Sequence, residues 1–198
     1  HERNAYAQLA QRLERSTLEI INTSLQHKTK LIKVIKTRIE LAEHFAKLGY
    51  TKGVEIGVLS GQFSQKLCQA NPNLKLYGLD AWGIGENKRK EYHLKSLEEA
   101  KIRLKPYNVD LIHKLSMDAV KDFDNESLDF VYIDANHQPQ FVEGDIREWG
   151  KKVKNGGIIS GHDYAVDIVP VVDNYAKINN LKLNTTDFED GGISWWME

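Results

Sequence analysis

Acidic and histidine side chains recur directly after short apolar runs along this chain of 198 residues. Carboxylates at such positions accept hydrogen bonds and hold cations, and a histidine near a carboxylate can act as a general base near neutral pH. The positions of this kind are Glu55, Asp80, Asp118, Asp134, His137, His162 and Asp163. A succession of polar strand ends predicts one lined binding cleft.

A glycine-rich stretch, residues 53–67 with the sequence GVEIGVLSGQFSQKL, joins an apolar run to a helix-like segment. Gly57 and Gly61 are expected to let the backbone approach a ligand closely and turn sharply into the helix. The spacing lacks the GxGxxG pattern of dinucleotide-binding proteins, and Glu55 would repel a pyrophosphate at the helix start. A carboxylate there favours a ligand with a positive charge. A glycine-rich turn with a solvated Glu55 is the alternative.

Asp80 ends the next apolar run, 23 residues after Gly57. An acid about 20 residues beyond the glycine loop accepts hydrogen bonds from ribose hydroxyls in this type of fold. A ligand with a ribose, a positive charge and little phosphate matches S-adenosylmethionine. These residues therefore predict S-adenosylmethionine as the cofactor, with Asp80 on its ribose.

The elements that must position these residues alternate between strands and helices. The predicted strands are 53–58, 74–82, 109–116, 128–136 and 156–164, and the predicted helices are 62–70, 86–105, 138–152 and 167–179. Residues 181–187 and 193–198 are predicted to form a hairpin around the turn FEDGG. The alternation predicts an α/β fold: a doubly wound, Rossmann-like, mainly parallel seven-stranded sheet with an antiparallel C-terminal hairpin strand.

Residues 3–48 have apolar side chains at helical spacing and no strand pattern, and Gly49 ends this region. We expect residues 1–49 to form an N-terminal helical extension, either a cap or a dimerisation arm, ahead of a domain formed by residues 50–198. A homodimer through these helices is the expected assembly. Packing of the same segment against the core of the domain is the alternative.

Composition excludes several classes of function. The formal net charge of −1 argues against a nucleic-acid-binding surface. No apolar run approaches the roughly 20 residues of a membrane-spanning helix, so no membrane partner is expected. The single cysteine, Cys68, and the lack of a signal-peptide pattern favour a reducing compartment, and we expect a cytoplasmic protein.

Four segments, VEIGVLSGQFS, LYGLDAW, VYIDANH and GGIISGHDY, resemble the class I S-adenosylmethionine-dependent methyltransferases. The chain is most similar to the small-molecule O-methyltransferase branch, which includes macrolide-sugar methyltransferases and cephalosporin-hydroxylase-like proteins. The resemblance covers about residues 50–198. It implies the transfer of a methyl group to a hydroxyl of a small molecule, with sugars and phenols as the leading acceptors and a nitrogen acceptor as an alternative.

The resemblance also implies which residues contact the cofactor. Glu55 and the loop after it would face the methionine part, Asp80 the ribose, and residues 116–118 the adenine. For Trp82 and Met117, ordinary core packing is an equal alternative. The implied cofactor contacts are Glu55, Gly57, Ser60, Gly61, Asp80, Ala81, Trp82, Ser116, Met117, Asp118 and Asp134.

The catalytic residues implied by the resemblance lie after the fourth and fifth strands. His137 is expected to be the general base, with Asp134 and His162 beside it, and a surface histidine is the alternative for His137. Asp134 and Asp163 match two ligands of metal-dependent relatives, whereas His162 stands in the third position. The expected metal is Mg²⁺ or Mn²⁺, and the imidazole favours Mn²⁺, iron or zinc because Mg²⁺ prefers oxygen ligands. His162 as a second base or acceptor contact is the alternative.

Two functions of other classes remain open. An NAD-linked Rossmann oxidoreductase would need a phosphate cradle, which Glu55 and the glycine spacing disfavour. A non-catalytic adenosine-ligand-binding protein would use the N-terminal helices as its interaction surface.

His113 is expected at the surface, outside the set of strand ends.

Overall fold

Seven strands form one sheet in the order β3-β2-β1-β4-β5-β7-β6 in the computed structural model, which describes residues 34–85, 88–189 and 191–198. The chain separates into two units, His1–Val34 and Ile35–Glu198, and the second unit contains this sheet. The strands are β1 Lys52–Ile56, β2 Lys75–Asp80, β3 Val109–His113, β4 Leu128–Ile133, β5 Val153–Gly161, β6 Leu183–Thr185 and β7 Trp195–Met197.

The first five strands are parallel, and β7 lies antiparallel between β5 and β6. This arrangement confirms the predicted doubly wound, mainly parallel sheet with an antiparallel C-terminal hairpin. The strand order reverses at β1, which pairs with β2 on one side and β4 on the other. A reversal of this kind opens a crevice at the carboxyl ends of the two central strands.

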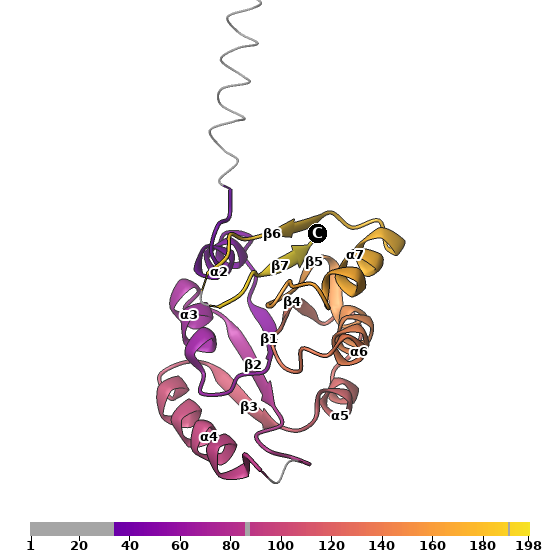
Figure 1. Cartoon of the computed structure of the whole chain (residues 1–198). Helices are drawn as coiled ribbons and strands as arrows, with labels where there is room; N and C mark the ends of the chain where they lie inside the picture. Colours follow the sequence, from indigo (N-terminus) through magenta and orange to yellow (C-terminus); the bar gives the residue numbers. More distant parts are fainter. Residues whose placement is uncertain (1–33, 86–87, 190) are drawn as a thin grey trace, which may run out of the picture. The chain divides into compact units, whose positions relative to one another are not determined.

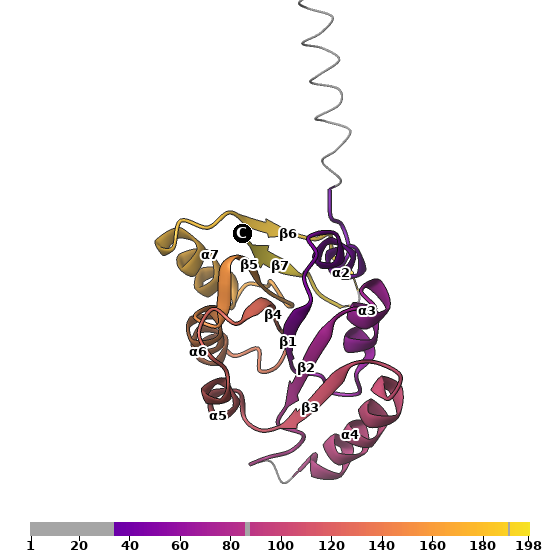
Figure 2. The same cartoon turned by 180° about the vertical axis from the view of Figure 1, so that it is seen from behind.

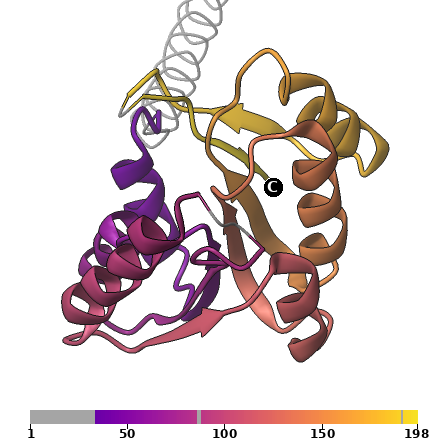
Figure 3. The ribbon, with the colours of Figure 1, turned by 60° about the horizontal axis from the view of Figure 1, so that its bottom comes forward.

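Helices cover both faces of the sheet, as Figures 1 and 2 show from opposite sides. Figure 3 shows the two helical layers on either side of the strands. The helices α2, α3 and α4 lie over one face, and α5, α6 and α7 over the other. Their bounds are α2 Arg38–Lys47, α3 Gln62–Ala70, α4 Lys90–Leu104, α5 Ser116–Ala119, α6 Pro139–Gly150 and α7 Val169–Ile178, with a 3-10 turn η1 at Val120–Asp122.

Alternation along the strands places an apolar cluster on each face of the sheet, and a third cluster lies beneath α4. In β1, Val54 and Ile56 join the cluster beneath α6 and α7. In β7, Trp195 belongs to that cluster, whereas Trp196 packs with the cluster beneath α2 and α3. Both faces are therefore apolar, which explains why the central strands read as nearly continuous apolar runs.

The helix α2 packs onto the sheet through Leu41, Ala42 and Phe45, which are all buried. Residues 35–49, which we assigned to the N-terminal extension, lie in the same unit as the sheet, and the division into an extension and a domain stays a prediction. The remaining part of the predicted extension, residues 1–33, lies outside the described residues, and the homodimer through it stays a prediction. None of the helices in the described ranges has the length and apolar character needed to cross a bilayer.

The segment between β3 and β4 differs from the sequence prediction. The strand β3 ends at His113, three residues before the predicted end, and Ser116 begins the short helix α5. A helix of four residues is too short to show a hydrophobic period, so the sequence pattern could not separate it from the strand.

Candidate active site

The polar residues predicted at strand ends meet at one edge of the sheet because β1, β2, β4 and β5 are parallel and in register. Backbone hydrogen bonds continue past the ends of the strands. The Asp134 N–H donates to the Ile56 carbonyl at 2.7 Å, and the His162 N–H donates to the Ile133 carbonyl at 3.0 Å. Asp134 is thus held beside the end of β1, and His162 beside the end of β4.

Glu55 is the buried acid of this edge, with 1% of its surface exposed. The Ser64 hydroxyl of α3 donates a hydrogen bond to its carboxyl group. Burial raises the pKa of Glu55 to about 8, while the hydrogen bond from Ser64 lowers it and the charges of Asp134 and Asp80 raise it further. Asp134 and Asp80 are therefore close enough to act on the Glu55 carboxyl group, and a cation bound nearby would favour its ionised form.

Asp80 joins the loops that follow β1 and β2. One of its carboxylate oxygens accepts from the Leu59 N–H at 2.8 Å, and the other accepts from the Trp82 N–H at 2.7 Å. Each oxygen keeps a second lone pair, because an ionised carboxylate can accept about four hydrogen bonds. The half-buried Asp80 is thus oriented by the backbone and retains acceptor capacity for two hydroxyl groups.

Gly57 and Gly61 have positive φ angles of 98° and 77°. A Cβ on Gly57 would lie 1.9 Å from the Asp134 carbonyl oxygen, and a Cβ on Gly61 would lie 2.9 Å from a methyl carbon of Leu104. The close approach that these glycines allow is therefore between the first loop and two neighbouring segments of the protein. Contact of their backbone with a ligand stays a prediction.

Trp82 is 1% exposed and packs with Val58 and Leu97 beneath α4. Its indole N–H donates to the Leu59 carbonyl at 2.8 Å. The structure therefore places Trp82 in the core behind the strand ends, and contact with the cofactor stays a prediction. It supports the same loop whose N–H holds Asp80.

His113 is exposed, as the sequence analysis expected. It is the last residue of β3 and stands opposite Asp80 in the strand register. Its Nε2 lies 2.8 Å from the Ala81 carbonyl oxygen, and its ring meets the Trp82 ring edge-on with centroids 5.6 Å apart. The structure thus brings His113 beside Asp80, a neighbour that the sequence analysis did not assign to it.

Residues 116–118 form the rim below β3, and their side chains have different surroundings. The Ser116 hydroxyl donates to Asp145 and accepts from the Trp149 indole N–H at 2.7 Å, so it anchors α5 to α6. Burial raises the pKa of Asp145 to about 6. Met117 and Asp118 are exposed, and Asp118 pairs with Lys121 at 3.0 Å. Of the three, Met117 and Asp118 present side chains that a ligand can reach.

Asp134, His162 and Asp163 come together after β4 and β5. Their nearest ligand atoms all lie within 4.8 Å of one another. His162 Nδ1 is 3.3 Å from one Asp163 oxygen and 3.9 Å from one Asp134 oxygen. Two carboxylates and an imidazole at these separations form a possible divalent-cation site.

His137 lies on the exposed side of this cluster. Its Nε2 is 3.1 Å from Asp163 Oδ2 and 3.5 Å from Asp134 Oδ1, and 53% of its side chain is exposed. The hydrogen bond to Asp134 raises the pKa of His137, burial lowers it, and the charge of Asp163 raises it again. The ring is therefore a stronger base than a free histidine and remains within reach of a molecule from solvent.

The segment before β7 closes over the other side of the cluster. A Cβ on Gly192 would lie 2.5 Å from His162 Cε1 and 2.7 Å from Asp163 Oδ1. The Trp195 indole N–H donates to the His162 carbonyl at 3.1 Å. His162 is only 8% exposed, and its Nε2 finds no hydrogen-bond partner among the described residues. The Nδ1 of the same ring faces the two carboxylates.

The donor set fits a divalent cation, and it favours Mn²⁺ over Mg²⁺ because one ligand is an imidazole nitrogen. The side chains of Asp134 and Asp163 are 21% and 24% exposed, so water or an acceptor hydroxyl can reach the cluster. Glu55, Asp80 and Asp134 at the carboxyl ends of the strands fit S-adenosylmethionine, because the positive charge of that cofactor would offset the effect of the two aspartates on Glu55.

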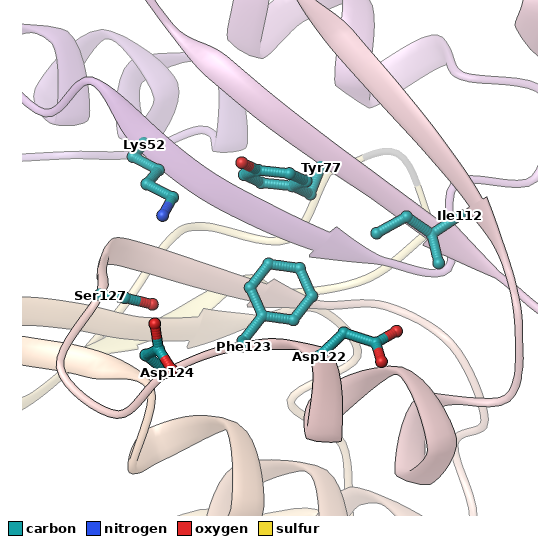
Figure 4. A pocket seen from close by; sticks show the side chains of 7 residues that line it. All are labelled: Lys52, Tyr77, Ile112, Asp122, Phe123, Asp124 and Ser127. Atoms are coloured by element: carbon teal, nitrogen blue, oxygen red, sulfur yellow. The ribbon is translucent and has the colours of Figure 1, made fainter.

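A cavity of about 200 Å³ lies elsewhere, on the sheet face beneath η1 (Figure 4). Lys52 begins β1, whereas the candidate site lies beyond the other end of that strand. Its lining residues are Lys52, Tyr77, Ile112, Asp122, Phe123, Asp124 and Ser127, none of which the sequence analysis placed in a site.

Comparison with known proteins gives the same picture at the level of family and fold. The chain matches a family model described as a methyltransferase domain over residues 54–164. This range contains Glu55, Asp80 and Asp134 and ends just after Asp163. Among the curated proteins compared, none matches the chain.

Solved structures with the same fold include a putative caffeoyl-CoA O-methyltransferase from Staphylococcus aureus, with a TM-score of 0.62, 12% identity and 90% of both chains covered. An O-methyltransferase from Bacillus cereus, determined with S-adenosylhomocysteine, has a TM-score of 0.61 and 15% identity over 90% of this chain and 88% of that one. The O-methyltransferase TomG from Streptomyces achromogenes, determined with S-adenosylmethionine, has a TM-score of 0.60 and 14% identity over 86% and 84%. Identities this low show the fold alone. The family model matches more than half of the chain, and the chain therefore belongs to the methyltransferase-domain family.

Proposed function

We propose that this protein transfers a methyl group from S-adenosylmethionine to a hydroxyl oxygen of a small molecule. The observation that carries the proposal is the convergence of Glu55, Asp80 and Asp134 at the ends of three adjacent strands, with His137 hydrogen-bonded to the third acid. The acids suit a cationic nucleoside, and the histidine suits an acceptor that must lose a proton.

Asp80 would hold the ribose of the cofactor, because its oxygens are fixed by two backbone N–H groups and keep free lone pairs. Glu55 would lie near the methionine part, and Met117 and Asp118 near the adenine. When bound, S-adenosylmethionine supplies a methyl group on an activated sulfonium. The protein then needs to align the acceptor and exclude water.

His137 would remove the proton from the acceptor hydroxyl at Nδ1, because Nε2 carries the N–H that faces the two carboxylates. The imidazolium that results is stabilised by Asp163 at 3.1 Å and Asp134 at 3.5 Å, both from Nε2. The exposure of the ring leaves room for an acceptor to approach from solvent. Proton removal by a positioned base typically contributes about 10²- to 10⁴-fold to the rate.

Asp134, His162 and Asp163 would hold a divalent cation, Mn²⁺ in preference to Mg²⁺. When bound, such an ion supplies positive charge that favours the ionised form of a nearby hydroxyl. The two acids also face His137, so one cluster would orient the acceptor and the base together.

The acceptor class is proposed to be a sugar or a phenol. The similar structures include several O-methyltransferases, among them a putative caffeoyl-CoA O-methyltransferase and an enzyme of tomaymycin synthesis. These likenesses support an oxygen acceptor on a small molecule.

The first test is a thermal shift with S-adenosylhomocysteine and with NAD. A ligand at about 100 times its dissociation constant stabilises the folded state by roughly 2.7 kcal/mol, which is a measurable rise in melting temperature. We expect the rise with S-adenosylhomocysteine only. A rise with NAD alone would support an NAD-linked oxidoreductase and contradict the proposal.

The second test follows a labelled methyl group from S-adenosylmethionine onto a panel of sugars and phenols, with Mn²⁺, with Mg²⁺ and after chelation. Calorimetric titration of Mn²⁺ into the protein and into the Asp163→Asn variant measures the metal site without relying on turnover. Cofactor binding without methyl transfer to any acceptor, with or without His137, would favour a non-catalytic ligand-binding protein.

A further inference from the structure

Arg38, the first residue of α2, lies where three elements of the unit meet. The side chain of Thr37 caps the helix by accepting from the Glu40 N–H at 3.0 Å, which places Arg38 at the first helical position. The Arg38 guanidinium lies over the ring of Phe63 in the first turn of α3, 5.1 Å from the centroid. This distance is within the range of a cation–π interaction, which restricts the position of the guanidinium.

The segment after β6 holds the start of α2 in place. The Asp187 N–H donates to the Lys36 carbonyl at 2.9 Å, and the Arg38 N–H donates to the Glu189 carboxylate. This segment continues to Gly192, which touches His162 and Asp163. Arg38 is therefore connected through one short stretch of chain to the candidate catalytic cluster, and Figure 1 shows this stretch, in yellow, passing α2.

The Arg38 charge acts on the ends of the two central strands. It lowers the pKa of the buried Glu55 in β1 and of the buried Tyr132 in β4. Both side chains belong to the sheet face that α2 and α3 cover, since Tyr132 packs in that cluster and Glu55 bonds to Ser64 of α3. The positive charge of Arg38 thus lies near Glu55, on the side of the candidate site where α3 begins.

The methionine part of S-adenosylmethionine carries an ammonium group and a carboxylate. The acids Glu55, Asp80 and Asp134 suit the ammonium and the sulfonium but repel the carboxylate. An arginine matches a carboxylate with two parallel hydrogen bonds. Resting on the proposed function, we propose that Arg38 binds the carboxylate of the cofactor's amino acid and so selects ligands with a complete amino-acid tail.

The test uses calorimetry with three ligands that differ only in this tail. S-adenosylhomocysteine has the ammonium and the carboxylate, 5′-deoxy-5′-(3-aminopropylthio)adenosine has the ammonium alone, and 5′-methylthioadenosine has neither. In Arg38→Gln we expect S-adenosylhomocysteine to bind about 10- to 100-fold more weakly, the range for a lost charge-assisted pair. The two ligands without a carboxylate should bind within about twofold of their affinity for the unmodified protein.

Two further variants make the result decisive. Arg38→Lys keeps the charge without the fork and should give an intermediate affinity for S-adenosylhomocysteine alone. Arg147→Gln removes an exposed arginine that pairs with Glu148 on α6 and should leave all three affinities unchanged. Melting temperatures without ligand report whether each variant is folded.

The outcomes separate this inference from the function on which it rests. Equal weakening of all three ligands in Arg38→Gln would show a structural role for Arg38 and overturn the inference, as would unchanged affinity for S-adenosylhomocysteine. Failure of the unmodified protein to bind any of the three would instead contradict the proposed function, and the inference with it.

Discussion

Glu55 is a carboxyl group whose ordinary charge is suppressed by its surroundings. Burial raises its pKa to about 8, and two neighbouring acids add to the shift. At neutral pH it is therefore mostly protonated, and its proton is released when a cation binds nearby. This property of one residue can be measured in two independent ways.

The first prediction is a release of protons on binding of S-adenosylmethionine between about pH 7 and 8. The positive sulfonium and ammonium lower the pKa of Glu55, so part of the population loses its proton. Titration calorimetry in two buffers with different ionisation enthalpies counts these protons. Glu55→Gln should abolish the release, and an equal release in both proteins would contradict the assignment.

The second prediction concerns stability without ligand. The pKa of Glu55 is raised from 4.5 to about 8 on folding. Between these two pH values the folded state therefore binds more protons than the unfolded state. Its contribution to the free energy of unfolding therefore falls as pH rises through the window, by at most about 1.4 kcal/mol per pH unit. Urea unfolding of the unmodified protein and of Glu55→Gln should give a difference that grows with pH. Parallel curves would be the opposing result.

His137 leads to the third prediction, a loss of turnover without a loss of cofactor binding. We expect His137→Ala to lower kcat by about 10²- to 10⁴-fold, because the acceptor hydroxyl loses its base. The affinity for S-adenosylhomocysteine should stay the same, since the ring lies on the exposed side of the cluster. His44→Ala on α2 is the matched control with unchanged kcat. A variant that keeps full turnover would remove His137 from the mechanism.

At the scale of elements, the stretch between β6 and β7 joins α2 to the catalytic cluster. It bonds to the start of α2 through Asp187 and Glu189, and it meets His162 and Asp163 at Gly192. The C-terminal hairpin, which the sequence predicts as an addition to the sheet, thus also lines one side of the candidate site.

The fourth prediction is that Gly192→Ala weakens metal binding while the fold remains. The new Cβ would lie 2.5 Å from His162 Cε1 and 2.7 Å from Asp163 Oδ1, so both ligands must move. Displaced ligands typically cost about 10- to 100-fold in metal affinity. Mn²⁺ titration measures the effect. Gly144→Ala in α6 is the control, because its Cβ would meet only Met117 Sδ at 3.9 Å; equal Mn²⁺ affinities in both variants would refute the proposed contact.

At the scale of the molecule, the unit Ile35–Glu198 contains the whole described sheet and the three core clusters of the described residues. Buried side chains of α2, α6 and α7 close the two faces, and the C-terminal strands complete the sheet. Both faces of the sheet are thus covered by elements of the same unit.

The fifth prediction is that a chain beginning at Ile35 folds cooperatively and binds S-adenosylhomocysteine with unchanged affinity. The apolar area that stabilises the fold is buried within this unit. Thermal unfolding and calorimetry check both parts. Loss of cooperative unfolding, or of cofactor affinity, would show that residues 1–34 contribute to the core or the site.

The sequence by itself determined the order of strands and helices, and with it the position of the acids. Alternating apolar runs and helical segments define a doubly wound sheet, and a parallel sheet brings the ends of its strands to one edge. Glu55, Asp80, Asp134 and Asp163 could therefore be placed together from their spacing alone. The helix at 62–70 was predicted with its observed bounds because its apolar period is regular.

Only the tertiary structure decided what each side chain faces. The burial of Trp82, the position of His113 beside Asp80, and the approach of Gly192 to His162 all depend on contacts between segments distant along the chain. The placement of Arg38 over Phe63 is of the same kind. The spacing of apolar residues along the chain determines whether a segment forms a helix or a strand. The environment of a side chain, and hence its charge and accessibility, depends on packing between distant segments, which local sequence patterns do not predict.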